Sequence, residues 1–406
     1  MKKTIVLMGR LDSKGKEYAY VKEKILAGGF DVITVDTGTR GSPIFKPDIS
    51  REEVAQAAGV EMKDVVDRTD ESKELQVMAA GAAKIARKLL DSGKLDGIMC
   101  LGGSRGTLIG TAAMRALPFG IPKVMVSTVA SGDVRAYVGT RDITIIHSVT
   151  DILGLNRMTK RLLAYAAGEI MGAVTADPGL EVSDKPLIAM SSMGGINRAA
   201  FAAQKILEDR GFEVVAFHAN GTGGQAMEET IEQGLIDGVL DLVTHELTDS
   251  LYGGSYDSGP TRLETAGKKG TPQVIVPGCL DFIAFSPPEK IPDAFKGRQV
   301  FKHTPEVAIT RANKDEMAGA GKAMAEKLNK ATGPTVVLIP NKGFSPADRQ
   351  DRPLFDSEAD AAFVQALKRN LKPSVKIVEV DAHINDKAFA RHAVDLLCEM
   401  MNKTRP

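Results

Sequence analysis

The chain has 406 residues, of which 43% are hydrophobic and 26% charged, and its 52 basic and 52 acidic side chains give a formal net charge of zero. This composition is that of an ordinary globular protein, and the length favours two domains over one. The balanced charge argues against binding to nucleic acid or a membrane surface through net charge.

The cysteines and the N-terminal segment predict a cytoplasmic protein. Cys100, Cys279 and Cys398 lie far apart, without a CxxC pair, which is typical of free thiols in a reducing compartment. The first apolar run spans only about five residues, too short for a signal peptide. No apolar stretch approaches the ~20 residues that cross a membrane. We therefore expect no membrane partner and no nucleic-acid partner.

Short apolar strands alternate with helices through the first half of the chain. The predicted strands are 4–9, 31–36, 95–103, 121–127 and 142–148, and the predicted helices are 16–29, 72–93, 107–117 and 156–174. Strands that are apolar throughout and separated by helices indicate a parallel sheet covered on both faces.

The second half repeats this pattern. The polar segment 177–186 is the predicted linker between a nucleotide-binding domain, 1–176, and a second domain, 187–406. Three segments align in the same order between the halves: 28–41 with 210–224, 94–106 with 235–247, and 120–133 with 270–282. The predicted fold class is therefore α/β, with two Rossmann-like domains of mostly parallel sheets related as a diverged internal repeat.

Four strand ends in the first half are rich in Gly, Ser, Thr and basic residues. They span 9–15, 36–41, 102–107 and 127–133 and include Ser13, Asp36, Gly41, Gly102 and Gly132. Ligands of open α/β sheets bind at such ends, where glycine lets backbone amides approach an anion. Asp12, Asp36 and Asp133 are candidate Mg²⁺ ligands, directly or through water. Each glycine turn alone could be structural, and neither a P-loop nor a GxGxxG fingerprint is present, but the four together predict an anion or nucleotide site.

The strand ends of the second half carry acid–base chemistry instead. The predicted catalytic residues are His245, Glu246, Asp249, Asp281 and His303, and the predicted substrate-binding residues are Arg262, Arg311 and Lys342. His245 and Asp249 are four residues apart and would share a helix face. A zincin site is not indicated, because HExxH lacks its second histidine here. The alternative is that His245 and Glu246 cap a helix and pair on the surface. His218 and Cys279 are weaker candidates, and the segment 340–355 is a loop too polar for a core.

Six motifs carry a family resemblance: RLDSKG (10–15), GGSRGT (102–107), STVASGD (127–133), HELTDSLYGG (245–254), GPTRL (259–263) and PGCLDF (277–282). With them the chain resembles the ATP-binding family named after the N-terminal region of the tomato mosaic virus resistance protein, whose bacterial members are uncharacterised. The resemblance implies two Rossmann-like domains, a homodimer, and ATP with Mg²⁺ in the N-terminal domain. Carried over by motif, the implied nucleotide contacts are Asp12, Lys14, Gly38, Gly103, Ser104, Gly106, Thr107 and Thr128.

Two functional hypotheses remain open. The first is an enzyme that uses bound ATP, or a related phosphorylated compound, on a small anionic metabolite in an interdomain cleft. The second is a nucleotide-sensing or regulatory dimer module in which nothing turns over. The absence of a P-loop keeps the second hypothesis open, whereas the contrast between an anion-binding half and an acid–base half favours the first.

Overall fold

The computed structural model describes residues 2–66, 71–176, 183–295, 297–352 and 354–404. The chain divides into two compact units, Met1–Glu181 and Val182–Pro406, and each is described by itself. The predicted linker 177–186 lies mostly outside the described residues. Within the described ranges, no helix has both the length and the apolar character needed to cross a bilayer.

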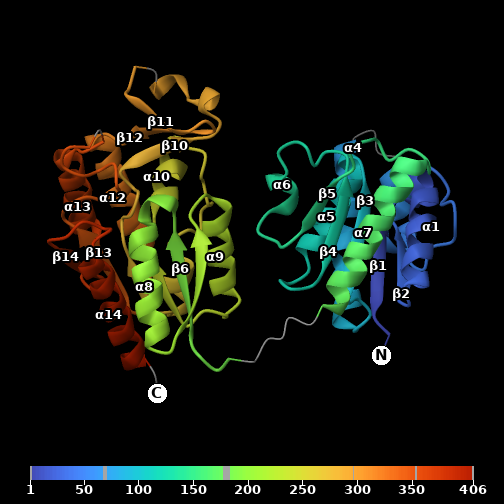
Figure 1. Ribbon diagram of the computed structural model, residues 1–406, viewed down its shortest axis with the longest axis horizontal. Coiled ribbons are helices and arrows are strands. Elements are labelled where there is room, and N and C mark those ends of the chain that lie inside the picture. The colour runs from blue at the N-terminus through green and yellow to red at the C-terminus, as the bar shows by residue number, and fades with distance from the viewer. Residues whose placement is uncertain (1, 67–70, 177–182, 296, 353, 405–406) are drawn as a thin grey trace. The chain divides into compact units, whose positions relative to one another are not determined.

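The N-terminal unit is built on one five-stranded parallel sheet (Figure 1). Its strands are β1 (Thr4–Gly9), β2 (Asp31–Asp36), β3 (Gly97–Gly102), β4 (Lys123–Ser127) and β5 (Thr144–His147). They lie in the order β2-β1-β3-β4-β5, and every neighbouring pair is parallel. The chain leaves β1 for β2 on one side and returns to β3 on the other. This reversal places the topological switch point, where open α/β sheets bind ligands, between β1 and β3.

Helices cover both faces of this sheet. They are α1 (Leu11–Ala27), α2 (Arg51–Ala58), α3 (Met62–Val66), α4 (Glu71–Asp91), α5 (Ser104–Arg115), α6 (Arg135–Val138) and α7 (Arg157–Thr175). Alternate strand residues point to opposite faces. Ile5 and Leu7 of β1 pack with residues of α1 and α7, whereas Val6 and Met8 pack with residues of α2, α4 and α5. The sheet is therefore doubly wound, as predicted.

The C-terminal unit repeats the topology and adds one strand. Its parallel strands are β6 (Leu187–Ser192), β7 (Glu213–His218), β8 (Gly238–Asp241), β9 (Gln273–Ile275), β13 (Thr335–Pro340) and β14 (Lys376–Val380). Their order is β14-β13-β9-β8-β6-β7. Without β14, this is the order of the N-terminal unit, with β6 in the place of β1. The three aligned segments of the sequence contain β2 and β7, β3 and β8, and β4 and β9, which occupy equivalent places in the two sheets.

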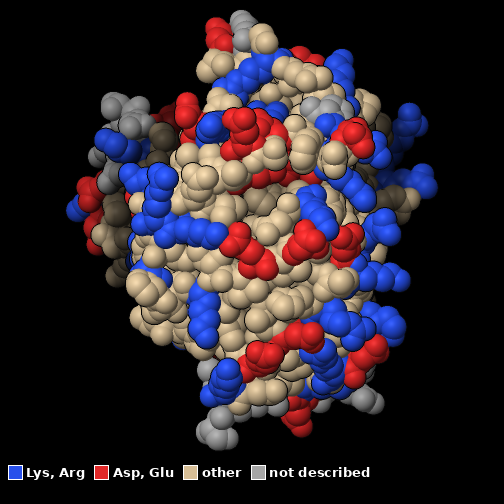
Figure 2. All heavy atoms as spheres, turned by 90° about the vertical axis from the view of Figure 1, so that its left-hand side faces the viewer, with Lys and Arg blue, Asp and Glu red and all other residues tan. Residues whose placement is uncertain are grey.

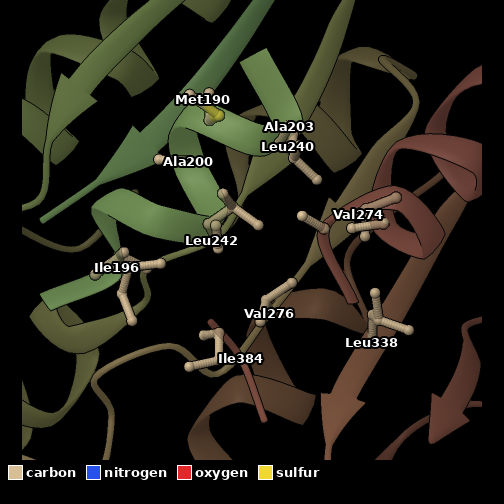
Figure 3. Packing of buried hydrophobic residues seen from close by; sticks show 14 of the residues in the cluster. Met190, Ile196, Ala200, Ala203, Leu240, Leu242, Val274, Val276, Leu338 and Ile384 are labelled. Atoms are coloured by element: carbon tan, nitrogen blue, oxygen red, sulfur yellow. The ribbon is translucent and has the colours of Figure 1, made fainter. Parts of the chain in front are cut away.

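The helices of the C-terminal unit again cover both sheet faces. They are α8 (Asn197–Asp209), α9 (Thr222–Glu232), α10 (His245–Tyr252), α11 (Thr265–Lys269), α12 (Lys314–Leu328), α13 (Ser357–Asn370) and α14 (Lys387–Thr404), with short 3-10 turns at η1 (Gly194–Ile196), η2 (Pro288–Lys290) and η3 (Asp293–Phe295). Met190, Leu240 and Val274 face α8 and α14 in the largest core cluster (Figure 3). Ile275 and Val337 pack on the other face, with residues of α12 and α13.

A small antiparallel sheet is inserted between β9 and α12. It consists of β10 (Phe282–Phe285), β12 (Val307–Arg311) and β11 (Val300–Thr304) in that order. It lies beyond the arrowhead of β6, at the carboxyl edge of the large sheet (Figure 1). The described part of the N-terminal unit has no equivalent, and the sequence did not predict it. Prolines at 287, 288 and 292 interrupt the segment and obscure its strand pattern.

Two helices begin earlier than the sequence predicted. The helix expected at 16–29 begins at Leu11, and the helix expected at 107–117 begins at Ser104. A glycine stands near each of these starts, Gly15 in α1 and Gly106 in α5, and glycine has a low helix propensity, so the sequence placed both starts in loops. Tertiary packing overrides that preference. The glycine-rich strand ends therefore lead directly into helix N-termini.

The surface carries both signs of charge. On the face shown in Figure 2, acidic and basic side chains are interspersed. On this face the mixture of signs agrees with the balanced composition.

Candidate functional site

A pocket of about 280 Å³ lies at the switch point of the N-terminal sheet. We call it the N-terminal pocket. Its lining residues come from the start of α1, the turn between β3 and α5, and the loop before α7: Arg10, Ser13, Lys14, Leu101, Gly102, Gly103, Ser104, Arg105, Gly106 and Asp151. The structure thus brings together six predicted nucleotide contacts from two of the four strand ends.

Two helix N-termini meet at this pocket. α5 begins after Gly103 and α1 after Arg10, and neither residue caps its helix through a side-chain hydrogen bond. The first amides of a helix have no intrahelical acceptor and carry partial positive charge. At α1 the Leu11 amide already donates to Asp36, so it is the start of α5 that suits the pocket wall to an anion before its side chains are considered.

Three basic side chains line the N-terminal pocket, each with one internal partner. Lys14 donates to the carbonyl of Ile152, Arg105 pairs with Glu71, and Arg10 lies 3.4 Å from Asp12. Among the described residues that line the pocket, Asp151 is the only carboxylate. The lining therefore has an excess of positive charge.

Packing requires glycine at some positions of this region but not at others. A Cβ on Gly102 would lie 2.9 Å from the Cα of Gly106, and a Cβ on Gly38 would lie 2.7 Å from the Cγ of Asp12. Packing of the chain itself requires glycine at both places. A Cβ on Gly103 would meet nothing closer than Thr128 Oγ1 at 3.5 Å, an ordinary contact. Gly103 is thus a pocket glycine that internal packing does not demand.

Asp12 and Asp36 hold the loop that follows β2. Asp12 Oδ2 accepts the amides of Thr39 and Arg40 at 3.1 and 3.0 Å, and Asp36 Oδ1 accepts those of Leu11 and Gly38 at 3.0 and 2.8 Å. Burial raises the pKa of both. For Asp12 the Arg40 amide and the charge of Arg10 outweigh burial, so its pKa is lowered, whereas that of Asp36 stays raised. Both carboxylates are engaged within the protein and stand outside the pocket lining.

Asp36 and Asp133, two of the predicted Mg²⁺ ligands, belong to different strand ends. Asp36 ends β2, whereas Asp133 lies in the loop after β4, and β1 and β3 stand between those two strands. Asp133 is exposed and pairs with Arg135 at 2.7 Å. The described residues contain no group of three or more His, Cys, Asp or Glu that could hold a metal. Neither Asp36 nor Asp133 lines the N-terminal pocket.

The other predicted contacts of the N-terminal unit are outside the lining of the N-terminal pocket. Thr107 is buried, with its hydroxyl 2.7 Å from that of Ser127. Thr128 directly follows β4 and lies beside Gly103. Gly41 and Gly132, in the loops after β2 and β4, are outside the pocket lining.

In the C-terminal unit, Arg262 lies at the centre of a buried ion-pair network. Its Nε donates to Glu246 at 2.6 Å, and its terminal nitrogens donate to Asp241 and to the carbonyl of Val243. Burial lowers the pKa of Arg262, but the charges of Asp241 and Glu246 more than reverse this, so it stays cationic. Only 2% of the residue is exposed. The hydrogen-bond donors of the Arg262 guanidinium are therefore directed at groups of the protein itself.

Glu246 joins α10 to the start of α9. Its Oε1 accepts the amides of Gly221 and Gly224 at 2.7 and 3.1 Å, and a Cβ on Gly224 would lie 2.1 Å from its Oε2. The glycines of this second glycine-rich turn therefore approach a carboxylate of the chain itself.

His245 and Asp249 share a face of α10, as their spacing predicted, and both are fully buried. His245 Nδ1 donates to the carbonyl of Cys279 at 2.8 Å, and its Nε2 lies 3.4 Å from Asp249 Oδ1. Burial lowers the pKa of His245, but the Asp249 carboxylate raises it more. Asp249 also accepts the amides of Tyr256 and Ala284, both at 2.9 Å. The pair therefore braces the turns beside β10.

Arg311 gathers three carboxylates, which we call the Arg311 cluster: Asp281, Asp348 and Asp360. The guanidinium donates to Asp360 and to the carbonyl of Asp281, both at 2.6 Å. Burial, with the charge of Asp348, raises the pKa of Asp281 to about 7 and that of Asp360 to about 8.

The loop 340–355 was predicted to be too polar for a core, yet Ser345 and Asp348 are fully buried. This part of the prediction is wrong, because internal hydrogen bonds hold both residues: Asp348 Oδ2 accepts the Phe344 amide at 2.9 Å, and the Ser345 hydroxyl donates to Asp281 at 2.8 Å. Lys342 instead lies on the surface and pairs with Asp381 at 2.9 Å.

A second pocket, of about 350 Å³, lies at the carboxyl edge of the C-terminal sheet. We call it the histidine pocket. It is lined by the ends of β6, β7 and β9, by the inserted sheet and by the loop after β13: Met193, Gly194, Gly195, His218, Tyr256, Cys279, Phe282, Ala284, His303, Val307, Ile309, Ser345, Pro346 and Ala347. Of the predicted catalytic residues it contains His303. It also contains both weaker candidates, His218 and Cys279. Gly194 and Gly195 line the pocket too, and the sequence analysis did not select them. Their position after β6, equivalent to that of Arg10 after β1, was the signal that could have found them.

The comparisons with known proteins agree on one family. Residues 3–178 match the N-terminal domain model, and residues 185–401 the C-terminal domain model, of an uncharacterised protein family, UPF0261. A UPF0261 protein of Clostridium tetani is 42% identical over 404 residues, covering 99% of this chain and 100% of that protein. The ToMV resistance protein Tm-1(GCR237) of Solanum lycopersicum is 35% identical over 324 residues, 78% of this chain and 43% of the tomato protein. Among solved structures, a UDP-N-acetylglucosamine 2-epimerase of Rickettsia bellii matches with a TM-score of 0.24 and 13% identity over 99% of this chain and 98% of that one.

Proposed function

We propose, for a chain that belongs to the uncharacterised protein family UPF0261, that the N-terminal unit binds ATP with Mg²⁺ and that the protein is an enzyme using this nucleotide on a small anionic metabolite. The observation that carries the proposal is the convergence of Arg10, Lys14 and Arg105 with the uncapped N-terminus of α5 in one pocket at the switch point. Polyphosphates are the common metabolites whose charge matches such a lining.

The backbone of the β3–α5 turn supports a phosphate in particular. Gly103 has room for a Cβ as far as the chain itself is concerned, so the space beside its backbone is free for a ligand. A phosphate oxygen could approach the first amides of α5 there without meeting a side chain. Ser104 and Ser13 add hydroxyl donors at the same pocket.

Mg²⁺ fits this site only in company with phosphate. Mg²⁺ keeps several waters and usually takes one or two carboxylates besides phosphate oxygens. Asp151 is the carboxylate that lines the pocket, whereas Asp36 and Asp133 are outside its lining. We assign Asp151 as the side chain nearest to a nucleotide-bound ion.

A second candidate function is a nucleotide-sensing module without turnover. It is favoured by the complete burial of His245, Glu246 and Asp249, whose polar groups hold internal turns. In that case ATP would tighten a homodimer, and the homodimer itself stays a prediction. Sedimentation equilibrium with and without ATP tests it, and steady release of ADP in the presence of a metabolite would instead favour the enzyme.

Calorimetric titration of the full chain tests nucleotide binding. We expect affinity to fall in the order ATP, ADP, AMP and adenosine, with Mg²⁺ strengthening the first two. Lys14→Met and Arg105→Met should each weaken ATP at least tenfold. Arg87→Met is the matched control, because Arg87 is exposed and pairs with Asp91 on α4. Adenosine binding as tightly as ATP, or no nucleotide binding at all, would overturn the proposal.

A further inference from the structure

The histidine pocket lies at the same edge of the second sheet as the N-terminal pocket does of the first, and both include residues that follow the equivalent strands β6 and β1. Met193 and Gly194 follow β6 as Arg10 and its neighbours follow β1, and both sheets have the same strand order at that point. The inserted sheet β10-β12-β11 contributes one wall of the histidine pocket. A volume of about 350 Å³ is at the small end of the roughly 300–1,000 Å³ of ligand pockets, so it suits a small metabolite.

Most of the histidine-pocket wall is apolar. Phe282 and Ala284 come from β10, Val307 and Ile309 from β12, and Met193 from the end of β6. An apolar group placed against these side chains is removed from water, which stabilises binding. The wall therefore selects a ligand with a compact apolar body.

Two imidazoles supply the charge-bearing groups of this pocket. His218 ends β7 and His303 lies on β11, so they come from two separate elements. Within the described part of the chain, neither imidazole has a hydrogen-bond or ion-pair partner. No Asp, Glu, Lys or Arg occurs among the described residues that line the pocket. A bound carboxylate would thus meet two free N–H donors and no like charge.

We propose that the histidine pocket binds a small organic acid, with its carboxylate held by His218 and His303 and its apolar body against the wall of β10 and β12. This deepens the proposed function by naming the class of metabolite and its site. Its polar lining differs from that of the N-terminal pocket, where three basic side chains and the start of α5 suit the greater charge of a polyphosphate.

The buried His245 acts as a positioning residue for this wall. Cys279 has a left-handed backbone, with φ of 56°, which a non-glycine residue rarely adopts. Its amide donates to the carbonyl of Phe344 at 2.9 Å, its carbonyl accepts from His245, and the His245 ring lies 4.5 Å from that of Phe282. Burial raises the pKa of the Cys279 thiol, so the sulfur stays protonated and belongs to the wall. His245, which was predicted to be catalytic, therefore packs against the residues of the pocket wall and does not line the pocket itself.

The test titrates the full chain, without nucleotide, with benzoate and hexanoate and with their uncharged amides. Imidazole proton resonances report the site directly, because the chain has only six histidines. We expect at least one of the two acids to shift the resonances of His218 and His303, and its amide to bind at least tenfold more weakly. His218→Gln and His303→Gln should each weaken the acid at least fivefold. His392→Gln, on the exposed surface of α14, is the matched control.

Three results would overturn the inference: neither acid shifts the two resonances, an amide binds as tightly as its acid, or both glutamine variants bind as the unaltered chain does. Both positions are exposed, so the substitutions leave the core intact and a loss of binding reports the site. Because no nucleotide is present, failure here leaves ATP binding untouched, and failure of ATP binding leaves this result standing.

Discussion

The turns after β3 and after β8 occupy the same place in the two units and are built in opposite ways. After β3, glycines lead into an uncapped helix beside a pocket. After β8, His245 and Glu246 begin α10, and Glu246 pairs with the buried Arg262. One fold position can therefore present its backbone to a ligand or be closed by a buried charge network. In the C-terminal unit, the pocket accordingly draws on the ends of β6, β7 and β9 and on the inserted sheet.

Breaking the buried network should have the largest effect. Arg262→Met leaves Asp241 and Glu246 as unpaired buried carboxylates, which costs about 3–5 kcal/mol of unfolding free energy. The loss should appear in urea unfolding of the full chain, and hydrogen exchange should localise it to Val182–Pro406. Arg298→Met is the control, because Arg298 pairs with Glu316 nearer the surface, where a pair is worth at most about 1 kcal/mol. Equal losses in the two variants would contradict the role assigned to Arg262.

In the glycine turn, the larger cost falls where the backbone itself is crowded. Gly102→Ala places a methyl group 2.9 Å from the Cα of Gly106, so the β3–α5 turn must shift. Overpacking of this kind costs about 1–3 kcal/mol. Hydrogen exchange should show the loss of protection in Met1–Glu181, with the C-terminal unit unaffected. An unchanged unfolding midpoint would show that the turn is looser than its contacts indicate.

The Arg311 cluster should make stability depend on pH. The folded-state pKa values of Asp281 and Asp360, about 7 and about 8, exceed the ~3.9 of an unfolded aspartate. The folded protein therefore binds more protons between about pH 4 and 8, and its unfolding free energy falls as pH rises through that window. Asp360→Asn should flatten the slope and stabilise the protein by about 1 kcal/mol at pH 8.5. Thermal unfolding across the window measures both effects. Glu358→Gln, an exposed control on α13, should keep the original slope.

The sequence predicted the parallel framework well because its strands are continuous apolar runs. The predicted strands 4–9 and 31–36 are the observed bounds of β1 and β2. The repeat also matched strands that occupy equivalent places in the two sheets. The antiparallel sheet was missed because prolines interrupt its segment, and the starts of α1 and α5 were missed because glycine lowers local helix propensity.

The sequence could predict that site residues lie at strand ends, but not which strand ends are adjacent in the sheet. Arg10, Lys14 and Arg105 meet because β1 and β3 are adjacent. Asp36 ends β2 and Asp133 comes after β4, two strands that are not neighbours, and strand order cannot be read from local sequence. Local sequence also does not distinguish an accessible acid–base group from a buried residue that holds the fold through internal hydrogen bonds. Glu246 has the structural role because Arg262, sixteen residues later in the chain, donates a hydrogen bond to it inside the protein.

The smallest stability effect should come from Gly103→Ala, and it decides what the glycine turn is for. The added methyl meets no atom of the chain closer than 3.5 Å. Alanine is a poorer helix N-cap than glycine, but it also restricts the unfolded chain, and these opposed effects should offset to within about 0.5 kcal/mol. ATP affinity should nevertheless fall at least tenfold in calorimetric titration, since the methyl group occupies the space beside the first amides of α5. Stability and affinity would then separate at Gly103, whereas both should fall at Gly102. If Gly103→Ala binds ATP as tightly as the unaltered chain, no phosphate approaches this backbone and the turn after β3 is only a turn.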